Sequence, residues 1–240
     1  MSNILAVDLL TLGAQTATGQ GAAVDITALR TALDLTVRVD TVTGTAPTLA
    51  VVIETSGTGT GAWREVGRLS ETIVDAGSYP LLVGECMQYV RVSYVIAGTA
   101  PSFTFSVAGN AHVLYCTRDD LSKFAMSSHV LDHIDESLKL ENIIAATGEV
   151  SDFLSVAYTL PLASWGASLT KHSAIVAVHN MASGPGRQGL DETLRLAYED
   201  TMRWLQSIGT GRLRPTTIID ATPTVEEDGA YVTSQTSRGW

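Results

Sequence analysis

The residues best suited to metal chemistry lie in one heptapeptide. His129, Asp132, His133 and Asp135 fall within the sequence HVLDHID, and two histidines four residues apart on a helix can share a metal ion. No glutamate stands next to His129, and the helical pattern around it is weak. The stretch is therefore open to two interpretations, a metal site or a solvated helix or loop, and the second is favoured.

Two other features resemble catalytic or binding motifs. His172 and His179 are seven residues apart in an apolar stretch, which favours core or interface histidines with satisfied nitrogens over catalytic bases. The loop SGTGTG at 56–61 is glycine-rich, but it leads into the strand-like segment Trp63–Val66. A phosphate cradle needs the glycines to open a helix, so this loop is interpreted as a flexible hairpin connection.

The sequence offers no catalytic constellation above background. The nucleophile-elbow pattern GxSxG is absent, and carboxylate pairs cannot be chosen without a fold to place them. Cys86 and Cys116 have no partners at metal-like spacing and are expected to be buried thiols, with a disulfide as the alternative. We therefore expect a binding or assembly protein with no enzymatic activity, no metal and no cofactor.

The net charge of the chain restricts the classes of partner that we expect it to bind. The 240-residue chain has a net charge of -10, with 5 basic and 9 acidic residues up to position 113 and 10 basic and 16 acidic residues after it. Two acidic halves argue against a broad phosphate-binding surface. The start MSNILAVDLLTLG lacks a basic n-region, so no secretory signal is expected. No stretch approaches the roughly 18 apolar residues of a membrane span.

The first half has the pattern of short antiparallel strands. Residues 32–40, ALDLTVRVD, alternate apolar and polar side chains, which is the period of a half-buried strand. Glycine-containing turn signals separate this run from five others. The other runs are at 48–54, 63–69, 79–83, 88–96 and 102–108. The spacing predicts an antiparallel β-sandwich or jelly-roll-like domain at 1–113.

The second half has helical periodicity and predicts a four-helix bundle at 114–211. Thr117 and Asp120 resemble a capping box at the first helix start. A second helix is expected at about 140–158, ended by Pro161, with Ile143, Thr147, Val150, Leu154 and Ala157 on one face. A buried central helix is expected at about 166–182. A fourth helix is expected at about 190–208, with Leu190, Leu194, Ala197, Leu205 and Ile208 on one face.

The last segment, 212–240, contains two prolines, many Thr and Ser residues and one short β-like run, Thr216–Ile219. A frayed terminus is one interpretation. The other is an extended arm that orders against another subunit, for example by adding a strand to it. The scattered apolar residues favour the arm. The fold class predicted for the whole chain is therefore α+β, with two domains and a C-terminal arm.

Three segments of the second half resemble the Mu-like phage head–tail adaptor family. They are YCTRDDL at 115–121, SDFLSVAYTLPL at 151–162 and YEDTMRWLQSIGTGRLRP at 198–215. The resemblance spans about 115–215, and the β domain precedes it. It implies a connector protein of the virion neck, assembled in the host cytoplasm, that forms a ring of about twelve copies beneath the portal. It implies as partners the portal protein, a stopper, tail-completion or tail terminator protein, and neighbouring copies, and no membrane. Genomic DNA would pass through without specific binding, as an acidic lumen suits.

The resemblance also implies roles for particular residues. The arm would contact the portal through Arg212, Arg214, Pro215, Ile218, Ile219, Tyr231 and Trp240. The helices would pack into a ring through Ile143, Leu154, Tyr158, Leu194, Tyr198, Trp204 and Leu205. An alternative function is a carbohydrate- or host-binding module of the virion, in which the β domain recognises the ligand and the helices anchor it. Trp63, Tyr79 or Tyr89 would then offer a sugar platform, although alternation places several of them in the core.

Overall fold

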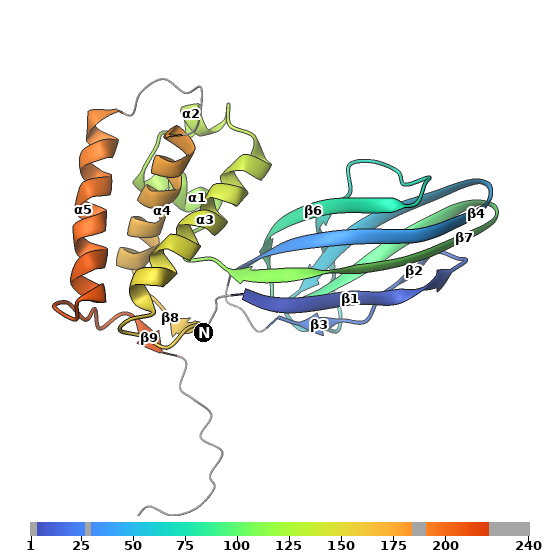
Figure 1. The fold of residues 1–240 in the computed structure, drawn as a ribbon, viewed down its shortest axis with the longest axis horizontal. Coiled ribbons are helices and arrows are strands. Elements are labelled where there is room, and N and C mark those ends of the chain that lie inside the picture. The colour runs from blue at the N-terminus through green and yellow to red at the C-terminus, as the bar shows by residue number, and fades with distance from the viewer. Residues whose placement is uncertain (1–3, 27–29, 184–190, 221–240) are drawn as a thin grey trace, which may run out of the picture.

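The computed structural model describes residues 4–26, 30–183 and 191–220 (Figure 1). An antiparallel β region is followed by a helical region, so the predicted α+β fold class is confirmed. The strands of the β region are β1 (Ile4–Gln15), β2 (Gly19–Gln20), β3 (Val24–Asp25), β4 (Thr31–Ser56), β5 (Arg64–Arg68), β6 (Gly77–Cys86) and β7 (Tyr89–Val113). The helical region contains α1 (Arg118–Phe124), α2 (Ser128–Leu131), α3 (Glu136–Leu154), β8 (Leu162–Ser164), α4 (Ala167–Ala182), α5 (Glu192–Gly209) and β9 (Ile219–Asp220).

Two very long strands organise the β region. Strands β4 and β7 pair antiparallel from Thr31 opposite Val113 to Ser56 opposite Tyr89. Figure 1 shows this ribbon curving back at the end farthest from the helices. Strands β1 and β6 pair with the halves of the ribbon nearest Thr31 and Val113, whereas β2, β3 and β5 pair with the other halves. The β region therefore has two layers, and the ribbon contributes to both.

The layers meet through apolar side chains. Tyr94 from one half of β7 and Phe105 from the other pack edge to face, with ring centroids 5.2 Å apart. The two halves of each long strand meet at a bend with the same sequence, GTAP, at 44–47 in β4 and at 98–101 in β7. Gly44 and Gly98 have φ angles of 115° and 125°, a conformation that favours glycine. These paired bends let the ribbon fold into a sandwich.

The predicted strands differ from the observed ones in two ways. Segments 32–40 and 48–54 are halves of β4, and 88–96 and 102–108 are halves of β7, because the bends keep the ladder nearly continuous. Strand β1 was not predicted. Its register against β7 shifts between Asp8 and Leu10 and again between Leu10 and Gly13, and such irregularities break the period-two pattern that identifies a strand.

The helix starts agree with local capping chemistry. Thr117 is the N-cap of α1, and the predicted capping box with Asp120 is present. Asp135 caps α3, accepting a hydrogen bond from the Ser137 backbone at 2.8 Å. The prediction of 140–158 for this helix was wrong at both ends, and Pro161 lies beyond its end rather than stopping it. Helices α4 and α5 agree closely with the predicted 166–182 and 190–208, although Leu190 lies outside the described residues.

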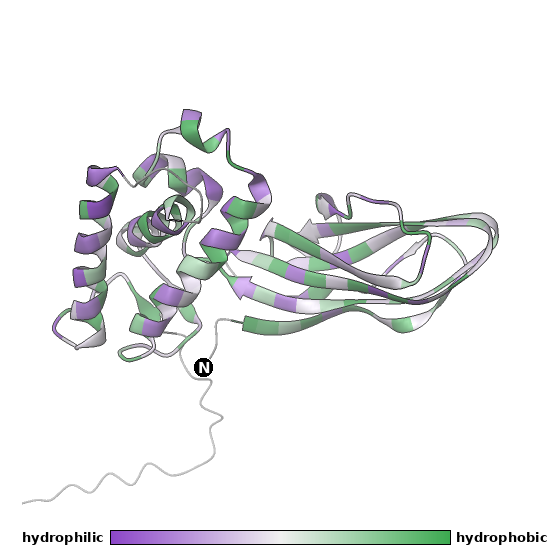
Figure 2. Ribbon diagram, turned by 45° about the horizontal axis from the view of Figure 1, so that its top comes forward, coloured by the Kyte–Doolittle hydropathy of each residue, from purple (hydrophilic) through white to green (hydrophobic). Residues whose placement is uncertain are grey.

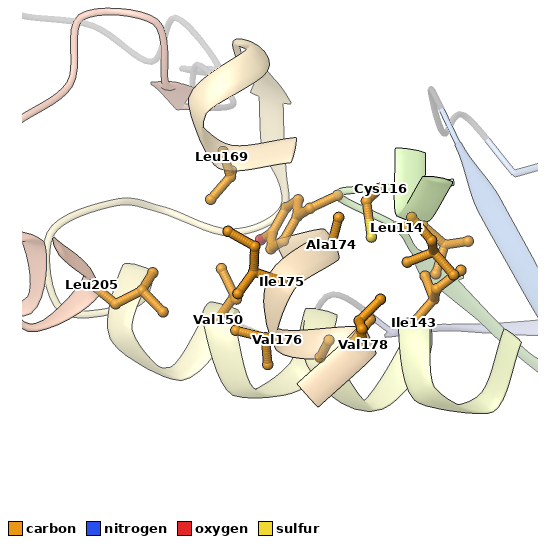
Figure 3. Close-up of a cluster of buried hydrophobic side chains, with 14 of the residues drawn as sticks. Leu114, Cys116, Ile143, Val150, Leu169, Ala174, Ile175, Val176, Val178 and Leu205 are labelled. Atoms are coloured by element: carbon orange, nitrogen blue, oxygen red, sulfur yellow. The ribbon is translucent and has the colours of Figure 1, made fainter. Parts of the chain in front are cut away.

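A second apolar core lies inside the helical region (Figure 3). Ile143 and Val150 of α3, Ala174 and Val178 of α4 and Leu205 of α5 are all fully buried there. Figure 2 shows hydrophilic and hydrophobic residues interleaved along α5, as expected of a helix with one face on the core. No described helix is long and apolar enough to cross a membrane.

Candidate functional site

The junction between the two regions is built around Tyr115. Strand β7 ends at Val113, and the next three residues, Leu114, Tyr115 and Cys116, are almost completely buried. The Tyr115 ring packs edge to face on Trp165, and its carbonyl accepts a hydrogen bond from the Trp165 indole at 3.1 Å. The Ser151 hydroxyl donates to the Tyr115 hydroxyl at 3.1 Å. The chain therefore passes from sheet to helices through a packed segment instead of an exposed linker.

Ion pairs reinforce this junction. Arg118 of α1 contacts Glu85 of β6 at 3.2 Å and Glu136 of α3 at 2.9 Å. Arg30, just before β4, contacts Asp120 of α1 at 3.2 Å. Burial opposes ionisation of Asp120, but hydrogen bonds from Thr117 and the charges of Arg30 and Lys123 outweigh it, so the pKa of Asp120 lies below its ordinary value. Opposite charges thus join the β region to α1, and α1 to α3.

Both cysteines lie near this junction and are buried and free. Burial raises the pKa of each thiol to about 12, with smaller contributions from neighbouring charges. A thiol of that pKa is inert at neutral pH because the thiolate is the reactive form. The prediction of buried thiols is confirmed.

The chain leaves the helical region beside α3 and β8. The Tyr158 hydroxyl donates to the Pro215 carbonyl at 3.3 Å, and the Arg214 guanidinium lies 5.5 Å from the Tyr158 ring centroid. Strand β9 then pairs with β8. The beginning of the predicted arm therefore folds against the chain's own helical region, and Ile218 is buried there.

The predicted arm residues consequently divide into three groups. Ile218 is buried in the chain's own core, and Pro215 is half-buried. Arg212, Arg214 and Ile219 are exposed. Tyr231 and Trp240 lie outside the described residues. The structure does not bring these residues to a partner, and their portal-binding role stays a prediction.

The predicted ring-packing residues lie mostly inside the subunit. Five of them are buried within the chain's own helical core: Ile143, Leu154, Tyr158, Leu194 and Leu205. Tyr198 and Trp204 of α5 are partly exposed. Side chains buried inside one subunit hold its helices together, so direct contacts with a neighbour fall to more exposed residues.

Two histidine–aromatic stacks hold α5 on α4. His172 stacks on Trp204 with ring centroids 4.2 Å apart, and its Nδ1 lies 2.9 Å from the Thr201 hydroxyl. Burial, and more weakly Lys171, lower the pKa of His172 to about 4. His179 stacks on Tyr198 at 3.6 Å. The prediction that both histidines have satisfied nitrogens was wrong for His179, because its Nδ1 is buried without a hydrogen-bond partner among the described residues.

In the structure, the HVLDHID stretch consists of solvated helix and loop. His129 lies in α2, and its ring packs edge to face on His133 at 5.3 Å. Asp135 is used as the N-cap of α3. Within the described ranges, no group of three or more potential metal ligands lies together.

The three aromatics considered for a sugar platform do not gather. Tyr79 pairs with Val37 toward the bent end of the ribbon, and its hydroxyl donates to the Asp75 carbonyl. Tyr89 pairs with Ser56 at the opposite end. The Arg91 guanidinium lies 4.2 Å from the Trp63 ring centroid and covers one face of that ring. The ring of Trp63 therefore already packs against a cation on one side.

The packed junction coincides with a boundary in sequence similarity. A model of the family "Bacteriophage Mu, Gp36" matches residues 115–234, so the match begins at Tyr115 and covers half of the chain. These helices define a phage structural protein with a β region added before it. The chain belongs to the bacteriophage Mu Gp36 family. The predicted Mu-like family is thereby confirmed, and the match runs 19 residues past the predicted end at 215.

Other comparisons are weaker. No curated protein matches the chain. A chain from the structure of infectious bursal disease virus Gx strain is 12% identical over 46% of this chain and 32% of its own length, with a TM-score of 0.34. The C-terminal family 22 carbohydrate binding module of Clostridium thermocellum Xyn10B is 13% identical over 46% of this chain and 87% of its own, with a TM-score of 0.29. TM-scores this low do not establish a shared fold.

Proposed function

We propose that the protein is a structural head–tail adaptor of a tailed phage. It would form a closed ring of about twelve copies beneath the portal, link the capsid to the tail and let DNA pass. The observation that carries the proposal is the family match over 115–234, which includes every helix of the structure. The virion neck is the proposed location, and assembly would take place in the host cytoplasm.

The exposed face of α5 is the proposed ring contact. Arg195 pairs with Glu192 at 2.6 Å and also with Glu199, and Arg203 pairs with Asp200 at 2.7 Å. These pairs lie along the helix, where each stabilises it by a few tenths of a kcal/mol, about 0.3–0.5. Leu196 is 48% exposed and would pack against a different face of the next copy, as head-to-tail ring closure requires.

The proposed portal-facing surface lies where the arm leaves the helices. Val156, Leu213 and Ile219 are 71%, 37% and 54% exposed. Val156 follows α3, Leu213 follows α5 and Ile219 lies in β9. Figure 1 shows the ends of α3 and α5 and strand β9 at one end of the helical region. Arg212 is exposed beside them. Exposed apolar side chains bordered by a cation suit contact with another protein.

The first test is the copy number of the protein in purified phage particles. Quantitative mass spectrometry against the major capsid protein should give about a dozen copies for a single ring. Hundreds of copies would indicate a capsid decoration or a tail-tube role and would overturn the adaptor proposal. Absence from the particles would overturn it as well.

A second test asks whether the part of the arm beyond the folded region is needed for portal binding. Because residues 215–220 pack on the chain's own helices, the informative deletion is 221–240 and not a longer one. We expect this deletion to abolish capture of the subunit by portal-containing heads. The matched control is Leu196→Glu, which we expect to prevent ring formation while a single subunit still binds the portal.

A further inference from the structure

A groove of about 510 Å³ lies where the end of α1 meets the start of α4. Its lining combines an apolar wall with charged residues, namely Phe124, Trp165 and Ala167 with Arg30, Asp120 and Lys123. Phe124 is 37% exposed and Trp165 is half-buried. Two accessible aromatic side chains in one hollow suit an apolar anchor residue of another protein chain.

The charged side chains of the groove differ in how far they reach toward solvent. The Asp120 side chain is only 9% exposed, whereas those of Arg30 and Lys123 are 44% and 61% exposed. Both cations pair with this one carboxylate, at 3.2 Å and 3.6 Å. The carboxylate is therefore covered and compensated, and the rim that a partner would meet is cationic.

The exposed face of α5 is complementary to this groove in polarity and charge. Leu196 is 48% exposed. Three acidic residues lie one helical turn from it, where side chains are neighbours on the helix surface: Glu192, Glu199 and Asp200. Two cations, Arg195 and Arg203, pair with them along the helix. Three carboxylates and two guanidinium groups leave a net charge of -1 around Leu196.

The groove and the exposed face of α5 lie at different ends of the helical region. Helices α1 and α5 both pack on α4, but Figures 1 and 2 show α5 at the end farthest from the β region. The groove includes Arg30, which directly precedes β4, so it lies at the junction with the β region. Two complementary surfaces that are separated on one subunit lead to head-to-tail contacts, which close into a ring when the rotation between copies permits it.

We propose that the groove beside Trp165 receives Leu196 and its acidic border on α5 from the next copy in the ring. The contact rests on the proposed adaptor function, which requires a ring, and it names the two surfaces that the ring joins. Leu196 would pack on Phe124 and Trp165, and the carboxylates around it would face Arg30 and Lys123. The apolar contact would supply affinity, while the charges would fix the orientation of the neighbouring copy.

The test is a covalent cross-link within assembled phage particles, using a chain that carries both Phe124→Cys and Leu196→Cys. The native cysteines are buried and have pKa values of about 12, so only the introduced thiols should react with a short bis-maleimide. We expect a ladder of linked multiples of the chain on a denaturing gel. Either single variant should stay at the size of one chain, because a head-to-tail contact does not bring two identical positions together.

Two further variants make the cross-link specific to the groove. Lys123→Cys changes a side chain that is 61% exposed, so it tests the same contact without disturbing the packing around Phe124. Combined with Leu196→Cys, it should give the same ladder. Leu12 of β1 is 53% exposed but lies outside the groove, so Leu12→Cys combined with Leu196→Cys should give none. An equally strong ladder from the Leu12 variant would overturn the contact.

The copy number measured in the same particles separates this contact from the adaptor role. About a dozen copies per particle without a ladder would overturn the contact and leave the adaptor role in place. A ladder from Leu196→Cys alone would place two α5 helices together and would also overturn the contact. A ladder from the double variant in particles with hundreds of copies would support the contact and overturn the adaptor role.

Discussion

The two regions of this protein are built on different kinds of core. The β core is apolar throughout, and the buried polar residues of the β region, Thr31, Thr55 and Ser56, lie at its helix-facing end. The helical region buries seven polar or charged residues among its described positions: Asp120, Lys139, Thr147, Ser151, Thr170, Ser173 and Thr201. Buried polar groups are stabilising only where they are hydrogen-bonded, so the helical core depends on specific polar contacts more than the β core does.

This difference suggests that the two regions have different roles. We expect the β region to be rigid, since its two layers share the same long ribbon. The helical region carries the family match, the arm and the histidine stacks. The buried polar residues therefore lie in the region for which assembly contacts are proposed. Four substitutions sharpen or break this comparison.

The largest effect is expected in the β core. Phe105 is fully buried between the layers and packs on Tyr94, so Phe105→Ala should lower the free energy of unfolding by about 3–5 kcal/mol. Urea denaturation followed by circular dichroism measures this. Thr104→Ala, on the outward face of the same strand, should change it by less than about 1 kcal/mol. Equal effects from the two variants would refute the rigid apolar core.

The bend of the ribbon should be the next most sensitive point. A Cβ atom on Gly98 would lie 2.8 Å from the Ala46 carbonyl oxygen, and Gly98 has a φ of 125°. Gly98→Ala should therefore cost about 1–3 kcal/mol. The matched control in the helical region is Gly148→Ala in α3, where a Cβ meets nothing within 4 Å, and it should stabilise by about 0.5–1 kcal/mol. A stabilising Gly98→Ala would contradict the proposed role of the bend.

Acid should weaken the helical region through His172. The folded pKa of about 4 lies below the ordinary value of 6.5, so the unfolded chain binds more protons between these values. Stability from this group is present above pH 6.5 and is lost as the pH falls toward 4. His172→Gln should flatten this part of the stability profile measured from pH 7 to 4. A His172→Gln profile with the wild-type slope would contradict this account.

The smallest effect is expected from an unsatisfied hydroxyl in the helical core. The Ser173 hydroxyl is completely buried and has no hydrogen-bond partner within the described part of the chain. Ser173→Ala removes this desolvated group while keeping the Cβ, so it should be neutral or stabilise by up to about 1 kcal/mol. A melting temperature lowered by several degrees would show that the hydroxyl has a partner in solution.

Sequence reasoning worked best where the signal was local. The capping box of Thr117 and Asp120, the apolar helix at α4 and the alternation in β4 all depend on residues within one or two turns. It failed for β1 because the register shifts disrupted the alternation. The repeated GTAP sequence was an available signal for the bend, and it would have joined the four predicted strands into two. The family match could be expected from three short motifs in order.

The candidate site depended on distant residues. No pattern places Arg30 beside Asp120, ninety residues away, or the Trp165 indole on the Tyr115 carbonyl. The ring-packing residues were chosen for apolar character, and burial inside the subunit has the same sequence signature as burial against a neighbour. Only the tertiary structure shows which of these two occurs.

The sequence alone determined the order of the β and helical regions, the acidic balance and the family, because capping, periodicity, charge and motif order depend on neighbouring residues. The tertiary structure decided that one folded ribbon builds both layers of the β region. It also decided that a buried tyrosine joins that region to the helices, and that the arm begins by folding back. These outcomes depend on which distant surfaces exclude water together, and that is determined only when the whole chain packs.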